Sequence, residues 1–185
     1  MDYIWFSNYE SKLWLPKSKE IGLIQKCPKI IKDRLFRFHF VDNVRGQTLP
    51  FAAEEIIEAN LNVQLTKKDK STLEFKILGK STAVAKGPWK LGENDWTPTH
   101  DLNHSIKTNV LGNATYDTIN KKFVEFEMVI IGHWVGKTQN NGRHSGPESG
   151  MIGITYNLSE KNYSNKIAPA FIDLYNADWV QQPEE

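Results

Sequence analysis

The chain has 185 residues and a formal net charge of +1 at pH 7, so its cationic and anionic side chains nearly balance. This length favours a single domain, and roughly 70% of the unfolded surface can be buried without help from a metal or disulfides. The balanced charge argues against a groove that neutralises nucleic-acid phosphates, so we expect no nucleic-acid partner. The single cysteine, Cys27, excludes an internal disulfide and a thiolate metal cluster.

The sequence contains no clear signal for membrane insertion or for export. No apolar run approaches the roughly 18 residues that a membrane-spanning helix needs, so we expect no membrane span. The first ten residues lack the basic start and the continuous apolar segment of a signal peptide. The protein is therefore expected to be cytoplasmic if the chain is complete, and exported if a leader has been removed.

The N-terminal segment is aromatic but has no regular period, with large side chains at Trp5, Phe6, Trp14 and Leu15. Because disordered segments rarely contain so many aromatic residues, we expect residues 1–25 to form an arm packed on the domain. Residues 26–185 then form a single β domain. Pro28 and the residues after it predict a short helix, since proline suits the first helical position.

Alternation of apolar and polar residues predicts the first strands. Residues 35–41 place three phenylalanines on one face, which is typical of a half-buried strand. Residues 52–58 favour one or two helical turns. Residues 61–77 predict a hairpin with its turn at 67–70 and with one face in water. Gly79 predicts a bulge or a bend in the second strand of this hairpin.

The stretch around which we expect the sheet to be organised runs from residue 106 to residue 158, and it begins with a second hairpin. Its return strand alternates between two faces, with Val124 and Phe126 on one and Glu125 and Glu127 on the other. Polar alternation stops at the end of this strand, so residues 129–134 are expected to be covered on both faces.

One further strand is predicted at residues 152–158. Together the patterns predict an all-β fold, an antiparallel meandering barrel or sandwich with a short N-terminal helix and an aromatic N-terminal arm. The residues expected in its core are Phe38, Phe75, Phe126, Ile130 and Ile154.

Three stretches carry a family resemblance: residues 35–48, residues 111–117, and residues 134–143 with the Gly-Pro that follows. They resemble an uncharacterised protein family found mainly in planctomycete bacteria, and the resemblance extends over residues 30–158. In that family Gly-Pro stands a few residues before Ile-Gly, whereas here Glu-Ser-Gly-Met separates the two pairs. The family has no assigned function, so the resemblance implies an intact bacterial domain and, since members often look exported, a removed leader.

The densest polar cluster follows the strand that ends at Trp134, and it includes Thr138, Asn140, Arg143 and His144. Amides, a guanidinium and an imidazole on a rigid scaffold are typical of a polar ligand site. We expect Trp134 or Trp89 to form the wall of that site. The alternative is a hairpin loop whose side chains satisfy only their own turns.

Arg45 is a second candidate binding residue, because an arginine held by an acid such as Asp42 can present a planar fork to a carboxylate or phosphate. The alternative is a purely structural pair between these two residues. Two histidines four residues apart, His100 and His104, suit a zinc site if His133 or His144 joins them. The alternative for these is a surface loop.

Catalytic patterns are weak. Neither loop serine lies in a G-x-S-x-G motif, and the neighbouring Glu125 and Glu127 are either a carboxylate pair or a solvated surface. We therefore expect no catalytic residue, no cofactor and no metal. The sequence favours a non-enzymatic β-barrel or sandwich module that binds a small or extended polar ligand. A hydrolase or metal-dependent enzyme that uses loop histidines is the alternative, and an accessory domain of an exported assembly is a third reading.

Overall fold

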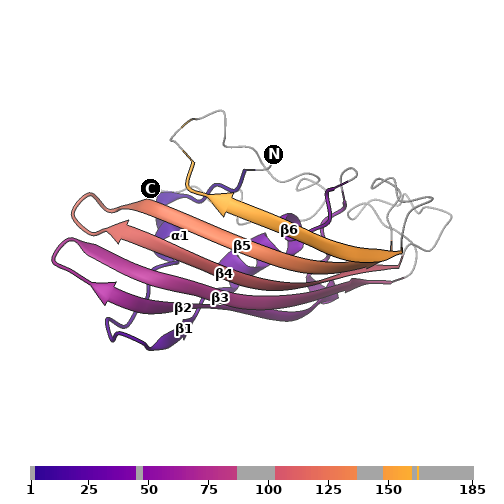
Figure 1. Cartoon of the computed structure of the whole chain (residues 1–185), viewed down its shortest axis with the longest axis horizontal. Helices are drawn as coiled ribbons and strands as arrows, with labels where there is room; N and C mark the ends of the chain where they lie inside the picture. Colours follow the sequence, from indigo (N-terminus) through magenta and orange to yellow (C-terminus); the bar gives the residue numbers. More distant parts are fainter. Residues whose placement is uncertain (1–2, 45–47, 87–102, 137–147, 160–161, 163–185) are drawn as a thin grey trace.

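The computed structural model describes residues 3–44, 48–86, 103–136, 148–159 and 162. Six antiparallel strands form one sheet in sequence order, as Figure 1 shows. The strands are β1 (Ile24–Lys26), β2 (Ile56–Lys68), β3 (Thr72–Ala85), β4 (His104–Asp117), β5 (Lys122–Gly136) and β6 (Ser149–Asn157). The predicted all-β antiparallel meander is confirmed. The sheet is not closed, because β1 and β6 do not pair with each other among the described residues.

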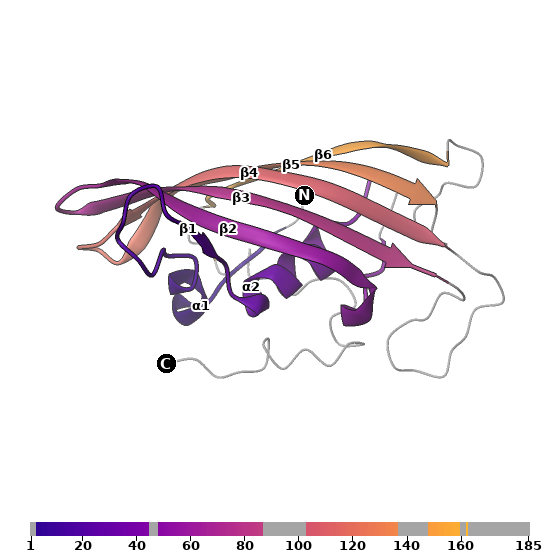
Figure 2. The same ribbon diagram turned by 90° about the horizontal axis from the view of Figure 1, so that it is seen from below.

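Short helices lie beneath the concave face of the sheet, as Figure 2 shows for α1 and α2. They are α1 (Asn8–Lys12), α2 (Lys29–Arg34), the π-helix η1 (Leu35–His39) and the 3-10 turn η2 (Ala53–Glu55). Side chains of α2, of η1 and of the N-terminal arm form the main core together with the inward residues of the strands. The concave side is therefore filled by the protein itself.

The strand predicted at residues 35–41 is wrong, because this segment continues α2 as a π-helix. Phe36 and Phe40 are four residues apart as well as on alternate positions, so they also share one side of a helix. Their ring centroids are 5.4 Å apart, and both side chains are buried. The backbone N–H of Phe40 donates to the carbonyl of Leu35, five residues earlier.

Gly79 lies in a regular part of the β2–β3 pairing, so the predicted bulge at this position is wrong. The register shifts of this pair occur between Ile56 and Glu58 and between Leu65 and Lys67. Gly79 instead permits a close approach of strands, because a Cβ there would lie 2.6 Å from the carbonyl oxygen of Asn60.

A register shift in the β4–β5 pair changes which residues of β5 face inward. The shift falls between Thr115 and Tyr116. As a result Phe123 packs inward, with its ring centroid 5.1 Å from that of Tyr116 and 5.7 Å from that of Phe126. Val124, expected on the inner face, is exposed. A bulge adds one residue to a strand and exchanges its faces beyond that point.

The predicted core is mostly confirmed. Phe38, Phe75 and Ile130 are buried, while Phe126 and Ile154 are partly buried and pack against the core. Burial on both faces of residues 129–134 is wrong, because the described helices cover only the concave side. Val129 and Ile131 point to the convex face and are exposed.

Candidate functional site

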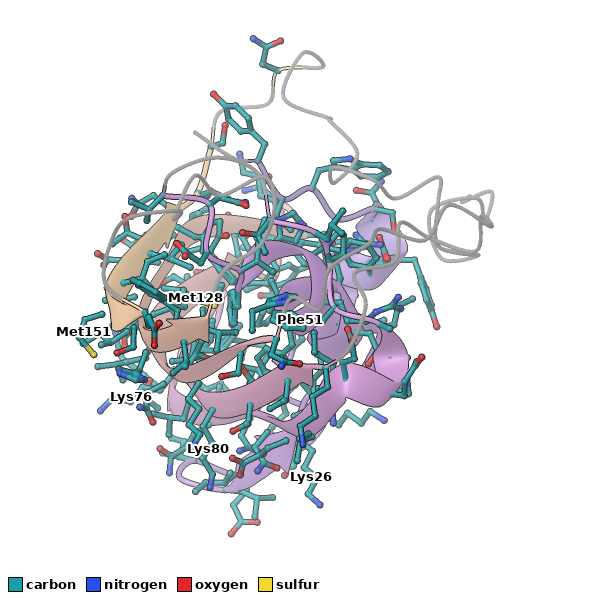
Figure 3. The ribbon with its side chains drawn as sticks, turned by 90° about the vertical axis from the view of Figure 1, so that its right-hand side faces the viewer. Lys26, Phe51, Lys76, Lys80, Met128 and Met151 are labelled. Carbon is teal, nitrogen blue, oxygen red and sulfur yellow. The ribbon has the colours of Figure 1, made fainter. Side chains whose placement is uncertain are left out.

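One end of the sheet lies on the right in Figure 1 and faces the viewer in Figure 3. There β3 ends at Ala85, β4 begins at His104, and β5 ends at Gly136. A pocket of about 290 Å³ opens at this end. We call it the strand-end pocket, and it is lined by Val84, Ala85, Lys86, Asn103, His104, Ser105 and Val135.

Gly136 fixes the shape of this end. Its φ of 84° lies in the left-handed region that favours glycine, and a Cβ there would lie only 2.1 Å from the carbonyl oxygen of Asn103. Its N–H donates to the carbonyl of Glu148 at 2.7 Å. The last residue of β5 is thus held against the start of β4 and against the residue that precedes β6.

A second, much smaller gap of about 10 Å³ lies on the inner side of the same end. Asp42, Phe51, His104 and Trp134 are among its lining residues. This volume is about the space that one water occupies, so the gap does not admit a ligand. His104 lines both spaces, and its ring lies 5.0 Å from the ring of Phe51.

The polar groups around Asp42 form most of their hydrogen bonds within the same turn, between residues 42 and 48. The Asp42 carboxylate accepts from the N–H of Val44 at 3.3 Å, and the Thr48 hydroxyl donates to the carbonyl of Asp42. The N–H of Thr48 donates to the side-chain oxygen of Asn43 at 2.7 Å. Arg45 lies outside the described residues, so both readings of an Asp42–Arg45 pair stay predictions.

Trp134 is the one predicted binding residue that the structure describes. It is buried on the inner face with Phe51 and Ile106, and its ring covers Gly150, where a Cβ would lie 2.9 Å from Cζ2. It lines the small gap and not the strand-end pocket. The other predicted binding residues lie outside the described part of the chain: Thr138, Asn140, Arg143, His144, Arg45 and Trp89. Their participation stays a prediction.

The two described histidines of the zinc hypothesis lie on opposite faces of the sheet. His104 is at an inward position of β4, whereas His133 pairs with Lys107 on the exposed outer face of β5. These two imidazoles therefore cannot share one metal ion. Within the described ranges, no three His, Cys, Asp or Glu residues are grouped so that they could hold a metal.

Sequence patterns missed the lining of the strand-end pocket, in particular Lys86, Asn103 and Ser105. The available signal was their position, because these residues flank the long irregular stretch between two strands, and such flanks often carry function. Glu125 and Glu127 are both exposed on the outer face, far along β5 from this pocket.

Comparisons with protein-family models, with curated proteins and with solved structures found no match to this chain. The geometry of the described residues is therefore the basis for assigning a function. None of the described helices combines the length and the apolar composition needed to cross a membrane.

Proposed function

We propose that the protein is a non-enzymatic module that binds a small polar ligand in the strand-end pocket. The supporting observation is the pocket of about 290 Å³, which is near the lower limit of the volumes that small-molecule sites occupy. Its lining combines apolar side chains, which exclude water, with a few polar groups, which orient a ligand. That combination is typical of binding sites for small molecules.

The polar groups of the pocket favour a ligand with an anionic group. Among the described lining residues, Lys86 alone has a full charge at neutral pH, and none of them is a carboxylate. Asn103 and Ser105 add an amide and a hydroxyl that can bind a carboxylate or its neighbouring oxygens. A small carboxylic acid suits this lining, because one carboxylate can face Lys86 while other oxygens bind Asn103 and Ser105.

Binding is favoured over hydrolysis by the orientation of the serine and the histidine among the described lining residues. His104 and Ser105 are consecutive residues of β4, so their side chains point to opposite faces of the sheet. A serine nucleophile needs an imidazole within hydrogen-bond reach, and this pair does not provide one.

Amide chemical shifts of the ¹⁵N-labelled protein test the proposal, with succinate as the probe. We expect saturable shifts at Asn103, Ser105 and Val135. A Ser105→Phe variant should lose them because the larger side chain fills the pocket. The control Asn113→Phe, an exposed position on the same strand, should keep them. Shifts that are absent in the parent, or unchanged in Ser105→Phe, contradict the proposal.

A further inference from the structure

Two valines of the strand-end pocket belong to one row of paired residues that crosses three strands. Ser105 of β4 pairs with Val84 of β3 on one side and with Val135 of β5 on the other. Directly paired residues of neighbouring strands point to the same face of a sheet, so the Ser105 hydroxyl lies between two valine side chains. This part of the lining is therefore apolar, with one hydroxyl at its centre.

The charged and amide groups of the pocket lie further toward the end of the sheet. Ala85 pairs with His104, Lys86 follows Ala85, and Asn103 precedes His104. Both polar residues therefore lie one residue beyond that pair. Two residues of chain span at most roughly 7 Å, so the backbones of Lys86 and Val84 are no further apart than this. One small molecule can contact the polar end and the valine row together.

A second anionic group on a ligand has no cation to pair with beside the valines. The next row of paired residues on the same face consists of Thr82, Lys107 and His133, and none of these lines the pocket. A carboxylate that leaves water needs a cation or several hydrogen-bond donors, whereas the Ser105 hydroxyl supplies a single donor. One donor is enough for a ketone or hydroxyl oxygen.

We infer that the pocket selects a short monocarboxylate with an uncharged end over a dicarboxylate of the same chain length. The carboxylate of the ligand faces Lys86, a ketone or hydroxyl oxygen binds Ser105, and the terminal carbon lies between Val84 and Val135. Short oxo acids and hydroxy acids have this chemistry. The selectivity rests on the proposed function, and the two valines are the residues that determine it.

Succinate and levulinate (4-oxopentanoate) are a matched pair of probes for this selectivity. Levulinate has the same chain length, and a methyl group takes the place of one carboxylate oxygen of succinate. Titrations followed by the amide shifts of Ser105 and Val135 give both dissociation constants. We expect levulinate to bind at least about fivefold more tightly, because its apolar end avoids the cost of removing a second charge from water.

The two possible failures of this experiment are distinguishable. Succinate that binds as tightly as levulinate, or more tightly, overturns the selectivity and leaves the proposed function standing. Absence of saturable shifts with both probes overturns the proposed function and the selectivity together.

Val135→Lys tests the role of the valine row directly. The new ammonium can pair with the second carboxylate of succinate, so we expect the preference to shift toward succinate. Val124→Lys is the matched control, because Val124 is on the same strand, is 43% exposed compared with 44% for Val135, and does not line the pocket. The control should keep the preference of the parent. An unchanged preference in Val135→Lys overturns the assignment of Val135.

Lys86→Gln tests the orientation of the ligand. Succinate and levulinate each present one carboxylate to Lys86, so the variant should weaken the binding of both by a similar factor. A loss confined to succinate would place its second carboxylate, and not the shared one, at Lys86, and would overturn the proposed orientation.

Discussion

Arg34 of α2 and Glu10 of α1 form an ion pair in the protein interior, with both side chains only 3% exposed. Both terminal nitrogens of the guanidinium donate to the carboxylate, and one of them also donates to the carbonyl of Trp5 at 2.8 Å. Glu10 additionally accepts from the N–H of Ser7 in a capping box at the start of α1. The pair therefore joins the N-terminal arm to the helix that follows β1.

We expect Arg34→Met to destabilise the protein by about 3–5 kcal/mol, because it leaves the Glu10 carboxylate buried without its cation. Urea denaturation followed by tryptophan fluorescence measures the loss. The double variant Glu10→Leu with Arg34→Met removes both charges and should be more stable than Arg34→Met alone. Equal or greater loss in the double variant would show that the pair itself, and not the stranded charge, governs stability.

Gly136→Ala should destabilise the protein by about 1–3 kcal/mol, because alanine is strained at a positive φ and its Cβ would meet the carbonyl of Asn103. The same change should weaken succinate-induced shifts in the strand-end pocket, since Asn103 must move. Gly153→Ala is the matched control. Its Cβ points into open space, so its melting temperature should stay close to that of the parent. Similar melting temperatures for both variants would contradict this role of Gly136.

Cys27 should be unreactive in the native protein. Burial raises the pKa of its thiol from 9.0 to about 12, although Lys32 partly opposes the shift. We expect Ellman's reagent at pH 8 to label Cys27 only after denaturation, since the thiolate is the reactive species. Rapid labelling of the folded protein would show that the side chain is accessible.

The same shift makes stability depend on pH. The folded state holds the thiol proton more tightly than the unfolded chain, so this contribution is complete below pH 9 and is lost between about pH 9 and pH 12. Urea midpoints of the parent should therefore fall over this range more steeply than those of Cys27→Ala. Parallel curves for the two proteins would contradict the assignment.

Strands were predictable from the sequence where one face of the sheet is exposed to solvent, because apolar and polar residues then alternate. The hairpin at residues 61–77 and the inward positions around Val110 follow the alternation that the structure shows. Residues 35–41 were mispredicted because aromatic residues on alternate positions fit a strand and also, at a spacing of four, a helix. Long-range packing beneath the sheet determines that this segment is helical, and a local sequence pattern carries no information about such packing.

The lining of the strand-end pocket was not predictable from local sequence patterns. The polar stretch after the strand that ends at Trp134 lies outside the described residues, so its role stays a prediction, and the pocket lining comes from the ends of three strands. Lys86 and Asn103 are separated by sixteen residues that lie outside the described part of the chain. Strand pairing brings the two together, and that pairing follows from the register of the whole sheet.

A pair of hydroxyls joins β3 and β4 inside the core. The side-chain oxygens of Ser81 and Thr108 are 2.6 Å apart, and both residues are buried at paired positions of the two strands. Ser81→Ala should destabilise the protein by about 1–3 kcal/mol, because the Thr108 hydroxyl loses its partner away from water. Thr108→Val should have an effect of similar size.

The double variant Ser81→Ala with Thr108→Val tests whether the two effects share one cause. Both polar groups are then replaced by apolar ones of similar shape, so the loss should be smaller than the sum of the single losses. Urea denaturation of the four proteins gives the coupling free energy directly. Additive losses would mean that each hydroxyl is satisfied independently, and that the short contact between them contributes nothing to stability.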